Sequence, residues 1–491
     1  MQEAREKCGV FGIYGQGLDV ARLTYFGLYA LQHRGQESAG IATSDSERLR
    51  IHKGMGLVAH VFEESDIKNL HGHIALGHNR YSTTGGSKPE HIQPMTGLGD
   101  SFALAHNGNI PSTTALWNYL RMCGDISEVS DSRIVVDAIS AAIKKGATLE
   151  DAIMEVYPFI TGAFSIIVIG VDRLIAIRDR CGIRPLSVGL LDEAYVFSSE
   201  TCAFKTIGAE YIRDVEPGEM IIADKKGLRS IRLAPPDPKF DIFEFVYFSR
   251  ADSTLLGRSV YEVRKHFGEQ LAKERKTKAD VIIPVPETAI PVALGYAHAT
   301  GIPFEIGLSK NRYIHRTFIQ PEQHLREQGV KMKLMAIPEV IRGKRVVVVD
   351  DSIVRGTTSR QIVKMLYDAG AKEVHFLVSS PPVKFPDFYG IDTPRQDQLI
   401  AAHKSEEETC KFLGASSLQY LSLEGMIHAV GVPESQLNTS CFTGRYPIDI
   451  GEHAREIVYD VSRFNSSKSA SSNRREGVSR LRRGRGLVRR R

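Results

Sequence analysis

The chain has 491 residues, enough for two or three domains, and its 42% hydrophobic and 25% charged residues are ordinary for a globular protein. No apolar run approaches the ~18–20 residues that cross a bilayer, residues 1–20 lack the hydrophobic region of a signal peptide, and the six cysteines form no CxxC pair. We therefore expect a soluble cytoplasmic protein with no membrane contact, not a membrane-spanning or disulfide-rich one.

The first half carries four polar motifs in a fixed order. A polar heptapeptide, residues 1–7, precedes Cys8, which opens the strand-like run CGVFGIY. The motifs LQHRGQESAGI (31–41), GHNRYSTTG (77–85), LAHNGNI (104–110) and SDS (130–132) come after it. From Ile160 to about Arg232, short apolar runs alternate with turns and predict an antiparallel sheet that completes the same domain.

Together these motifs resemble the glutaminase domain of class II glutamine amidotransferases, over about residues 8–235. The resemblance implies the N-terminal-nucleophile hydrolase fold, an α+β fold in which two antiparallel sheets lie between helical layers (αββα). The chemistry it implies is hydrolysis of the glutamine amide, which needs a nucleophile, a base, donors for an oxyanion and anchors for a free amino acid.

Cys8 is the expected nucleophile. An N-terminal residue carries its own base, because an α-amino group with a pKa near ~8 is partly neutral at physiological pH. While residues 1–7 are attached, the nitrogen of Cys8 is an amide and cannot take a proton. The sequence therefore predicts that residues 1–7 are a propeptide, removed between Lys7 and Cys8.

The remaining glutaminase roles are assigned by charge and by resemblance. Arg80 is expected to pair with the α-carboxylate of glutamine, and Asp131 to hold its α-ammonium. The side-chain amide of Asn107 and the backbone N–H of Gly108 are expected to form the oxyanion hole. Arg34, in HRGQ, is assigned to the mouth of the glutamine site. Each alone could be a surface charge or a turn residue. Arg133 stands where the family often has Glu, and we expect it to be peripheral.

A proline-rich break, APPDP (234–238), predicts the boundary to a second domain over residues 239–460. In it, GRSVYEVR (257–264) opens a helix and DVIIPVP (280–286) is a buried strand. The stretch VVVVDDSIVRGTT (346–358) predicts a strand buried on both faces, two acids where it ends, and a turn feeding a helix. Such a turn presents backbone N–H groups to an anion at the carboxyl edge of an α/β sheet.

That stretch resembles the loop of type I phosphoribosyltransferases that binds phosphoribosyl pyrophosphate (PRPP), whose α/β domain has a central parallel sheet. An ordinary strand-to-helix turn with solvated acids is the alternative for this stretch alone. The order of glutaminase and PRPP loop resembles the amidophosphoribosyltransferase family. The resemblance implies PRPP binding by Lys310, Arg312, Asp350, Asp351, Ser352, Arg355, Gly356, Thr357 and Thr358, with Lys331 and Lys333 as further phosphate contacts.

Magnesium is the expected cofactor, held near pyrophosphate by Asp350, Asp351 and the hydroxyl of Thr288. The family usually has Val-Gly where Ile314-His315 stands, and we expect the replacement of that glycine to stiffen the loop. Many relatives with a propeptide also bind a [4Fe–4S] cluster through four cysteines. The matching positions here are Asp241, Asp387, Asn438 and Cys441, so we expect no cluster and a plain thiol at Cys441.

The resemblance implies transfer of ammonia from glutamine to PRPP, a homo-oligomer (tetramer or dimer) and inhibition by purine nucleotides. Alternatives are another class II amidotransferase, such as a sugar-phosphate transaminating synthase or an asparagine synthetase, and a non-catalytic PRPP sensor. The net charge of +5 comes from residues 466–491, whose nine Arg and one Lys stand against one Glu, so the rest of the chain carries −4. We expect this tail to be disordered and solvated, with nucleic-acid contact unexpected.

Overall fold

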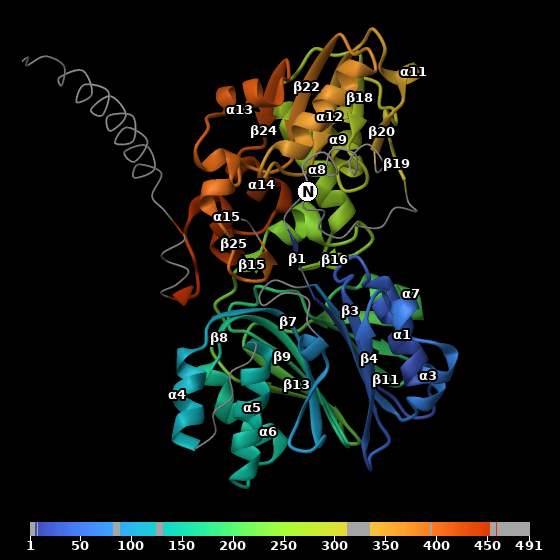
Figure 1. The fold of residues 1–491 in the computed structure, drawn as a ribbon, viewed down its shortest axis with the longest axis vertical. Coiled ribbons are helices and arrows are strands. Elements are labelled where there is room, and N and C mark those ends of the chain that lie inside the picture. Colours follow the sequence, from blue (N-terminus) through green and yellow to red (C-terminus); the bar gives the residue numbers. More distant parts are fainter. Residues whose placement is uncertain are drawn as a thin grey trace, which may run out of the picture.

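The computed structural model describes residues 5–6, 8–81, 89–123, 131–311, 334–392, 395–451 and 458, with the backbone alone at residues 5–6, 131 and 391–392. The chain forms two bodies stacked along its long axis, the first half of the sequence in one and the second half in the other (Figure 1). Within the described ranges, no helix is both long and apolar enough to cross a membrane.

Two antiparallel sheets build the first body. The larger has the strand order β12-β10-β11-β2-β5-β3-β4, and the smaller has the order β14-β13-β9-β8-β7-β6. The strands of the larger sheet are β2 (Gly9–Tyr14), β3 (Ser38–Ser44), β4 (Leu49–Met55), β5 (Ile74–Arg80), β10 (Ser187–Leu191), β11 (Ala194–Ser198) and β12 (Glu210–Asp214). Those of the smaller are β6 (Met95–Gly97), β7 (Phe102–Ser112), β8 (Thr161–Gly170), β9 (Leu174–Arg178), β13 (Glu219–Asp224) and β14 (Gly227–Arg232).

Helices cover the outer face of each sheet, and the two sheets meet over a shared apolar core that includes Val10, Leu76 and Ile167. The larger sheet carries α1 (Val20–Ala30), α2 (Val58–Val61), α3 (Glu64–Asn69) and α7 (Cys202–Ile207). The smaller carries α4 (Thr114–Cys123), α5 (Asp131–Lys144) and α6 (Leu149–Val156). This is the αββα layering that the first-half motifs predicted.

One expectation for this body is wrong in detail. Residues 160–232 do not form one sheet: β8, β9, β13 and β14 join the smaller sheet, while β10, β11 and β12 join the larger. The chain passes from one sheet to the other after Arg178 and returns after Asp214. Strands such as β9 and β13 are buried on both faces, so their hydrophobic pattern does not reveal to which sheet each belongs.

The second body is built on a parallel sheet of order β18-β21-β22-β24, as predicted. Its strands are β18 (Val281–Pro284), β21 (Arg345–Asp350), β22 (Glu373–Val378) and β24 (Ser417–Tyr420), and its larger helices are α8 (Val260–Glu274), α9 (Ile290–Thr300), α12 (Thr357–Asp368), α13 (Glu406–Leu413) and α14 (Leu423–Val430). All four valines of β21 are fully buried. Val347 and Val349 face one apolar core, Val346 and Val348 the other, as the two faces of a central strand require.

Short elements complete the fold. They are β1 (Arg5–Glu6), β15 (Phe240–Asp241), β16 (Thr254–Leu255), β17 (Arg258–Ser259), β19 (Leu308–Lys310), β20 (Leu334–Ala336), β23 (Ile391–Asp392), β25 (Leu437–Asn438), α11 (Pro338–Ile341), α15 (Ser440–Thr443), the 3₁₀ turns η1 (Pro89–His91), η2 (Tyr157–Phe159), η4 (Gln396–Gln398), η5 (Ile400–Ala402) and η6 (Glu434–Gln436), and the π-helical turn η3 (Glu244–Phe248). Strand β1 pairs antiparallel with β23, so the backbone before Cys8 is bound to the second body.

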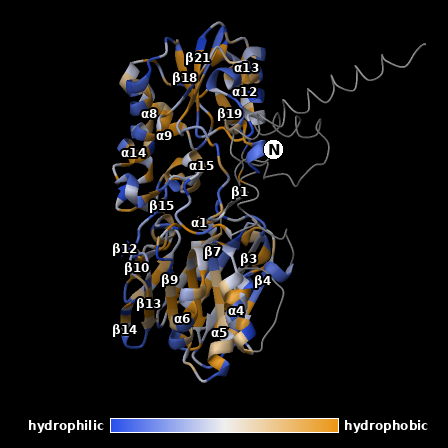
Figure 2. Cartoon of the chain, turned by 90° about the vertical axis from the view of Figure 1, so that its left-hand side faces the viewer, coloured by the Kyte–Doolittle hydropathy of each residue, from blue (hydrophilic) through white to orange (hydrophobic). Residues whose placement is uncertain are grey.

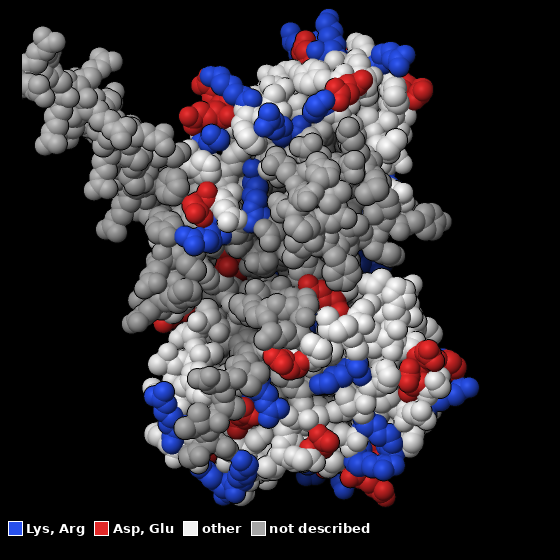
Figure 3. Space-filling model, viewed as in Figure 1, with Lys and Arg blue, Asp and Glu red and all other residues white. Residues whose placement is uncertain are grey.

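Colouring by hydropathy shows the apolar residues gathered on strands inside each body (Figure 2). On the face drawn in Figure 3, acidic and basic side chains are interspersed over both bodies. That mixture agrees with the near-neutral charge balance of the chain outside the basic tail.

Candidate functional site

Cys8 lies at the start of β2, next to the end of β5. Gly9 pairs with Asn79, which sets Cys8 beside Arg80, and the Cys8 thiol lies 3.9 Å from the carbonyl oxygen of Tyr81. The turn formed by residues 33–35 packs against the same end of β5. A Cβ on Gly35 would lie 2.6–2.8 Å from backbone atoms of Asn79 and Arg80, so this close approach requires glycine.

Arg80 is nearly buried, with Nη1 4.0 Å from a carboxylate oxygen of Glu37. The structure therefore brings this predicted carboxylate ligand next to the predicted nucleophile. Arg133, by contrast, donates to the carbonyl oxygen of Thr96 at 2.9 Å and pairs with Asp137 on its own helix. Its contacts point toward β6 and α5, in keeping with a peripheral role.

Asn107 and Gly108 lie on β7 of the other sheet, and Asn107 is linked to β2 through Ser199. The hydroxyl of Ser199 accepts hydrogen bonds from the backbone N–H of Val10 at 3.0 Å and from the Asn107 amide at 3.3 Å, joining β7 to the strand that begins after Cys8. Gly108 has φ +144°, and a Cβ there would lie 2.0 Å from the carbonyl oxygen of Ala163. Only glycine can hold the backbone in this position.

Two buried histidines, His78 and His106, lie beside one another at β7. Burial lowers the pKa of His78 to about 3, and its Nε2 lies 3.2 Å from the carbonyl oxygen of His106. Ser132 lies 3.2 Å from His106 Nδ1, which fixes the first turn of α5 beside β7. Asp131 is the first residue of that helix, and its side chain lies outside the described atoms.

Arg34 is not at an open mouth but fully buried between the two bodies. Its Nε donates to the carbonyl oxygen of Cys8 at 3.3 Å, and its Nη2 donates to Glu244 at 2.9 Å. Nη1 contacts both Glu244, at 3.2 Å, and Glu200. The guanidinium is turned to the nucleophile's own backbone and to two carboxylates, which suits a positioning role better than direct contact with glutamine.

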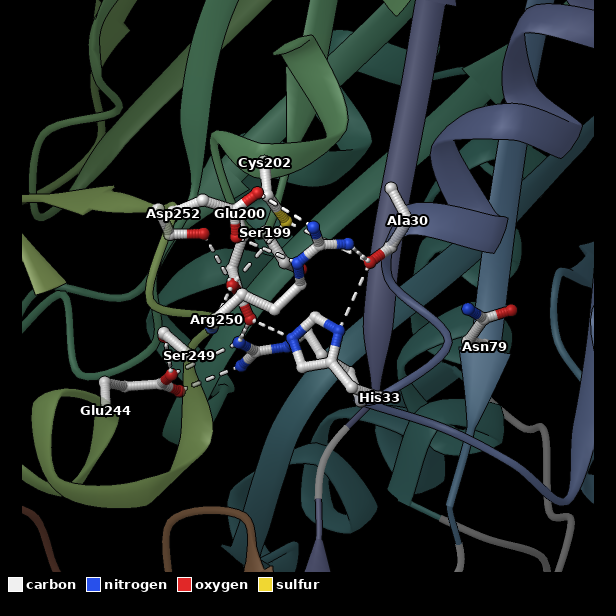
Figure 4. A network of polar contacts seen from close by, with 12 residues as sticks. Ala30, His33, Asn79, Ser199, Glu200, Cys202, Glu244, Ser249, Arg250 and Asp252 are labelled. Carbon is white, nitrogen blue, oxygen red and sulfur yellow. Dashed lines mark hydrogen bonds and ion pairs between the residues drawn. The ribbon is translucent and has the colours of Figure 1, made fainter. Parts of the chain in front are cut away.

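Glu200 collects donors from both bodies, as Figure 4 shows for part of this network. It accepts from His33 Nε2 at 2.7 Å, from the Ser253 hydroxyl at 2.7 Å and from the Arg250 backbone at 3.0 Å. Burial acts to raise the pKa of Glu200, but the interactions with His33 and Arg34 and the hydrogen bond from Ser253 outweigh it and hold that pKa well below its usual value. Glu200 is therefore a fixed buried anion.

Neither Glu200 nor Glu244 was found by sequence reasoning. Glu244 had a usable signal, because it is the one acid inside the apolar run IFEFVYF (242–248), and such a residue is buried only when it is paired. Glu200 comes after β11 in a polar turn, SSET, where nothing in the pattern distinguishes it from a solvated residue.

The second predicted site lies at the carboxyl edge of the parallel sheet. Thr288 comes after β18 and Asp350 ends β21, and these strands are neighbours in parallel register, so both residues face the same edge. The Asp350 carboxylate accepts from the Asp351 backbone at 2.9 Å, and the Ser352 hydroxyl donates to Asp351 at 2.7 Å. This edge offers hard oxygen donors, the kind that Mg²⁺ takes together with phosphates.

The turn after these acids ends at Gly356, whose φ is +75° and whose Cβ would lie 2.8 Å from Ile400. Helix α12 starts at Thr357 without a side-chain cap, so its first-turn N–H groups suit an anion near Thr357 and Thr358. Arg355 donates to Gln398 at 3.2 Å, and Lys310 is exposed at the end of β19. Arg312, Lys331, Lys333 and the Ile314-His315 pair lie outside the described residues.

The positions that match cluster ligands in relatives do converge. Asp241 pairs with Asn438 across β15 and β25 and forms an ion pair with Arg184 at 2.9 Å. Burial, opposed by Arg184 and assisted by the charges of Asp387 and Glu244, raises the pKa of Asp241 to about 7. Burial also raises the pKa of Cys441 above its usual value.

At each of the three Asp and Asn positions, at least one oxygen already has a protein partner. Asn438 accepts from the Ser440 backbone at 3.1 Å, and Asp387 accepts from the Tyr389 backbone at 2.7 Å. One thiol beside oxygens that are already bonded does not fit an iron–sulfur cluster. Over the described residues, no group of three or more His, Cys, Asp or Glu is arranged to hold a metal ion by itself.

Comparison with known proteins assigns a family to both halves of the chain. A family model described as "Glutamine amidotransferase domain" matches residues 78–206, and one described as "Phosphoribosyl transferase domain" matches residues 258–381. The amidophosphoribosyltransferase of Bacillus subtilis is 46% identical over 468 residues, 92% of this chain and 98% of that protein. That of Synechocystis is 49% identical over 459 residues, 92% of each chain. The solved B. subtilis glutamine PRPP amidotransferase, in complex with ADP and GMP, superimposes with a TM-score of 0.84 over 91% of this chain and 98% of that one.

Proposed function

The chain belongs to the amidophosphoribosyltransferase family, and from that premise we propose how its two sites share one reaction. The enzyme uses glutamine and PRPP to form 5-phosphoribosylamine, pyrophosphate and glutamate, the first committed step of purine biosynthesis. The observation that carries this function is the presence, in one chain, of the Cys8 site on two facing antiparallel sheets and of the acidic turn at the edge of the parallel sheet.

We propose that catalysis begins after residues 1–7 have been removed. The Cys8 sulfur attacks the side-chain carbonyl carbon of glutamine, and its proton passes to the freed α-amino group. The negative oxygen of the intermediate is held by the Asn107 amide and the backbone N–H of Gly108. Ammonia then leaves, and water hydrolyses the remaining thioester to release glutamate.

The buried Asn107 amide supports the oxyanion role. Its Oδ1 has no hydrogen-bond partner among the described residues, while its Nδ2 donates to Ser199. Rotating the amide by 180° directs the two N–H donors to the unpartnered side, and the Ser199 hydroxyl can then donate to the oxygen. Arg80 holds the glutamine α-carboxylate and Asp131 its α-ammonium, while Arg34 fixes the carbonyl of Cys8.

At the second site, we propose that the residues from Asp350 to Thr358 bind the ribose hydroxyls and 5′-phosphate of PRPP, with Lys310 and Arg312 meeting its other phosphates. Thr288, Asp350 and Asp351 would hold Mg²⁺ with the pyrophosphate group. Bound there, Mg²⁺ offsets the negative charge that develops on departing pyrophosphate. Ammonia from the first site attacks C1 of PRPP, and glutamine hydrolysis is coupled to PRPP binding.

Several properties are proposals of the same kind. The chain holds no iron–sulfur cluster, because three of the four matching positions are Asp or Asn. It is a homo-oligomer inhibited by purine nucleotides; the B. subtilis complex with ADP and GMP supports such binding. Its domains are residues 8–235 and 239–460, and its six free cysteines suit the reducing cytoplasm.

The test is a paired assay on protein whose N-terminus has been sequenced. Glutamate and pyrophosphate are measured after mixing glutamine, PRPP and Mg²⁺, with ammonium chloride replacing glutamine in a second series. We expect both products in equal amounts with glutamine, and pyrophosphate alone with ammonium. Full glutamine-dependent activity in protein that still begins at Met1 would refute the propeptide step, and no pyrophosphate in either series would refute the synthase assignment.

A further inference from the structure

A chain of buried charged side chains joins the two bodies, and the proposed reaction steps do not use it. Its central member is Glu244 in η3, whose carboxylate is fully buried. Glu244 receives two hydrogen bonds from Arg34, one from Arg184 at 3.1 Å and one from the Ser249 hydroxyl at 2.7 Å. Through Arg34 it is one side chain away from the backbone of Cys8.

Arg264 holds η3 from the other side. It lies on α8, is 3% exposed, and donates to the carbonyl oxygens of Phe245 and Ser249, each at 2.8 Å. These two oxygens lie near the two ends of the π-helical turn, so one guanidinium fixes the turn that carries Glu244. Burial lowers the pKa of Arg264 to about 10, which still leaves it charged at neutral pH.

The charge of Arg264 also interacts with an acidic residue of the second site. Among the acidic groups whose charge acts on it, the largest effect comes from Asp351 in the acidic turn, ahead of Glu200 and Glu244. A charge interaction therefore joins the turn predicted to bind PRPP to Arg264. Direct contacts then run from Arg264 through η3 to Glu244, Arg34 and the carbonyl of Cys8. Apart from the interaction between Asp351 and Arg264, the links are hydrogen bonds between buried groups. Phe245 and Glu244 are joined by the backbone of η3.

We propose that Glu244 and Arg264 are positioning residues of the glutaminase reaction, which set Cys8 according to the state of the PRPP site although neither touches glutamine. This inference rests on the proposed function. It gives the buried ion pair between Glu244 and Arg34 a role other than stability, since a buried ion pair is on average no more stabilising than a well-packed apolar pair of the same size. A connection through contacts becomes a coupling only when changing it alters the response of one site to the other.

The test uses the full chain and the variant Glu244→Gln, which keeps the shape and removes the charge. Glutamine hydrolysis is measured with and without PRPP, as kcat and KM separately, and ammonia-dependent formation of phosphoribosylamine is measured beside it. We expect the stimulation of glutamine hydrolysis by PRPP to fall at least tenfold, mainly in kcat. Ammonia-dependent synthesis should stay within twofold of the parent, because Glu244 is outside the PRPP site.

Glu219→Gln is the matched control. Glu219 is also a buried acid bound to an arginine, Arg213, by two hydrogen bonds of 2.8 Å, but it lies on β13 in the first body. Its loss should lower the thermal midpoint and leave the response to PRPP unchanged. If both variants lost that response equally, the loss would reflect a general decrease in stability, and the inference would be overturned.

The variant Arg264→Lys is a second, independent test. It keeps the buried charge, but one ammonium cannot take the two planar, separated bonds of the guanidinium, so we expect a partial loss of PRPP stimulation. Combined with Glu244→Gln, its effect should be less than additive, as for residues in one chain of contacts. It carries the test alone if Glu244→Gln does not fold.

The outcomes separate the two proposals. A folded Glu244→Gln variant with the parent's full response to PRPP would overturn the inference, and so would a parent enzyme that makes phosphoribosylamine but hydrolyses glutamine equally well without PRPP. A parent that makes no phosphoribosylamine from either nitrogen source would instead remove the proposed function.

Discussion

Replacing Asp241 by Asn should change how the stability of the protein depends on pH. Asp241 lies in the buried group that contains Asp387, Cys441 and Arg184, and its pKa is raised from 3.8 to about 7. The folded protein therefore keeps a proton on this carboxyl that the unfolded chain has already released. The stability that this gives is complete below pH 3.8 and is lost as the pH rises through about 7.

The expected magnitude is set by the two pKa values. The gap from 3.8 to about 7 corresponds to roughly 4 kcal/mol in all, of which about 3 kcal/mol is lost between pH 5 and pH 8. Asn has no proton to lose, so the variant should gain about 3 kcal/mol relative to the parent over that interval. The substitution also removes one partner of Arg184, which changes the free energy of unfolding by a further amount. That amount should be the same at both pH values, because Glu244 still binds the guanidinium.

The assay compares thermal midpoints of parent and Asp241→Asn at pH 5 and pH 8. At roughly 2–4 °C per kcal/mol for a domain of this size, the difference in midpoint should move by about 6–12 °C in favour of the variant at pH 8. Asp368→Asn removes an exposed carboxylate on α12 and serves as the control, with a difference that is the same at both pH values. If Asp241→Asn behaves like that control, the assignment of a buried proton to Asp241 is wrong.

Three further substitutions test the sites directly. Cys8→Ala should abolish glutamine-dependent synthesis and leave ammonia-dependent synthesis within about twofold, and retained use of glutamine would contradict the nucleophile assignment. Gly108→Ala forces a Cβ to within 2.0 Å of the Ala163 carbonyl, so glutaminase kcat should fall by roughly 10²–10³; a fall of less than threefold would show that this backbone is not needed. Gly356→Ala, with φ +75° and Ile400 at 2.8 Å, should raise the KM for PRPP about tenfold or more in either assay without changing the KM for glutamine.

Features that depend on local pattern could mostly be predicted from the sequence. Four consecutive valines are typical of a strand buried on both faces, and the structure has them at 0% exposure in the middle of the parallel sheet. The two predicted glutaminase motifs that contain Arg80 and Asn107 do meet at the strand that begins after Cys8. Motif order and alternation were sufficient there because each motif lies within a regular strand or at its end.

Features that depend on contacts between distant parts of the chain could not be predicted in this way. Glu200 and Glu244 meet Arg34 across 166 and 210 residues, and no periodicity signals a partner so far away. For the same reason, the hydrophobic pattern of residues 160–232 identified strands but not their division between two sheets. Arg34 was assigned to the glutamine site from its motif, and only its burial reveals that its donors are directed elsewhere.

The position of Glu244 has a consequence for exchanging parts between enzymes. The arginine that holds the backbone of Cys8 comes from the first body, but one of its two carboxylate partners, Glu244, comes from the second, just past the proline-rich boundary. A fragment cut at that boundary would retain Arg34 and Glu200 and leave Glu244 behind. A chimera that joins this ammonia-producing half to a different synthase domain must therefore supply a carboxylate at the position of Glu244, within reach of Arg34.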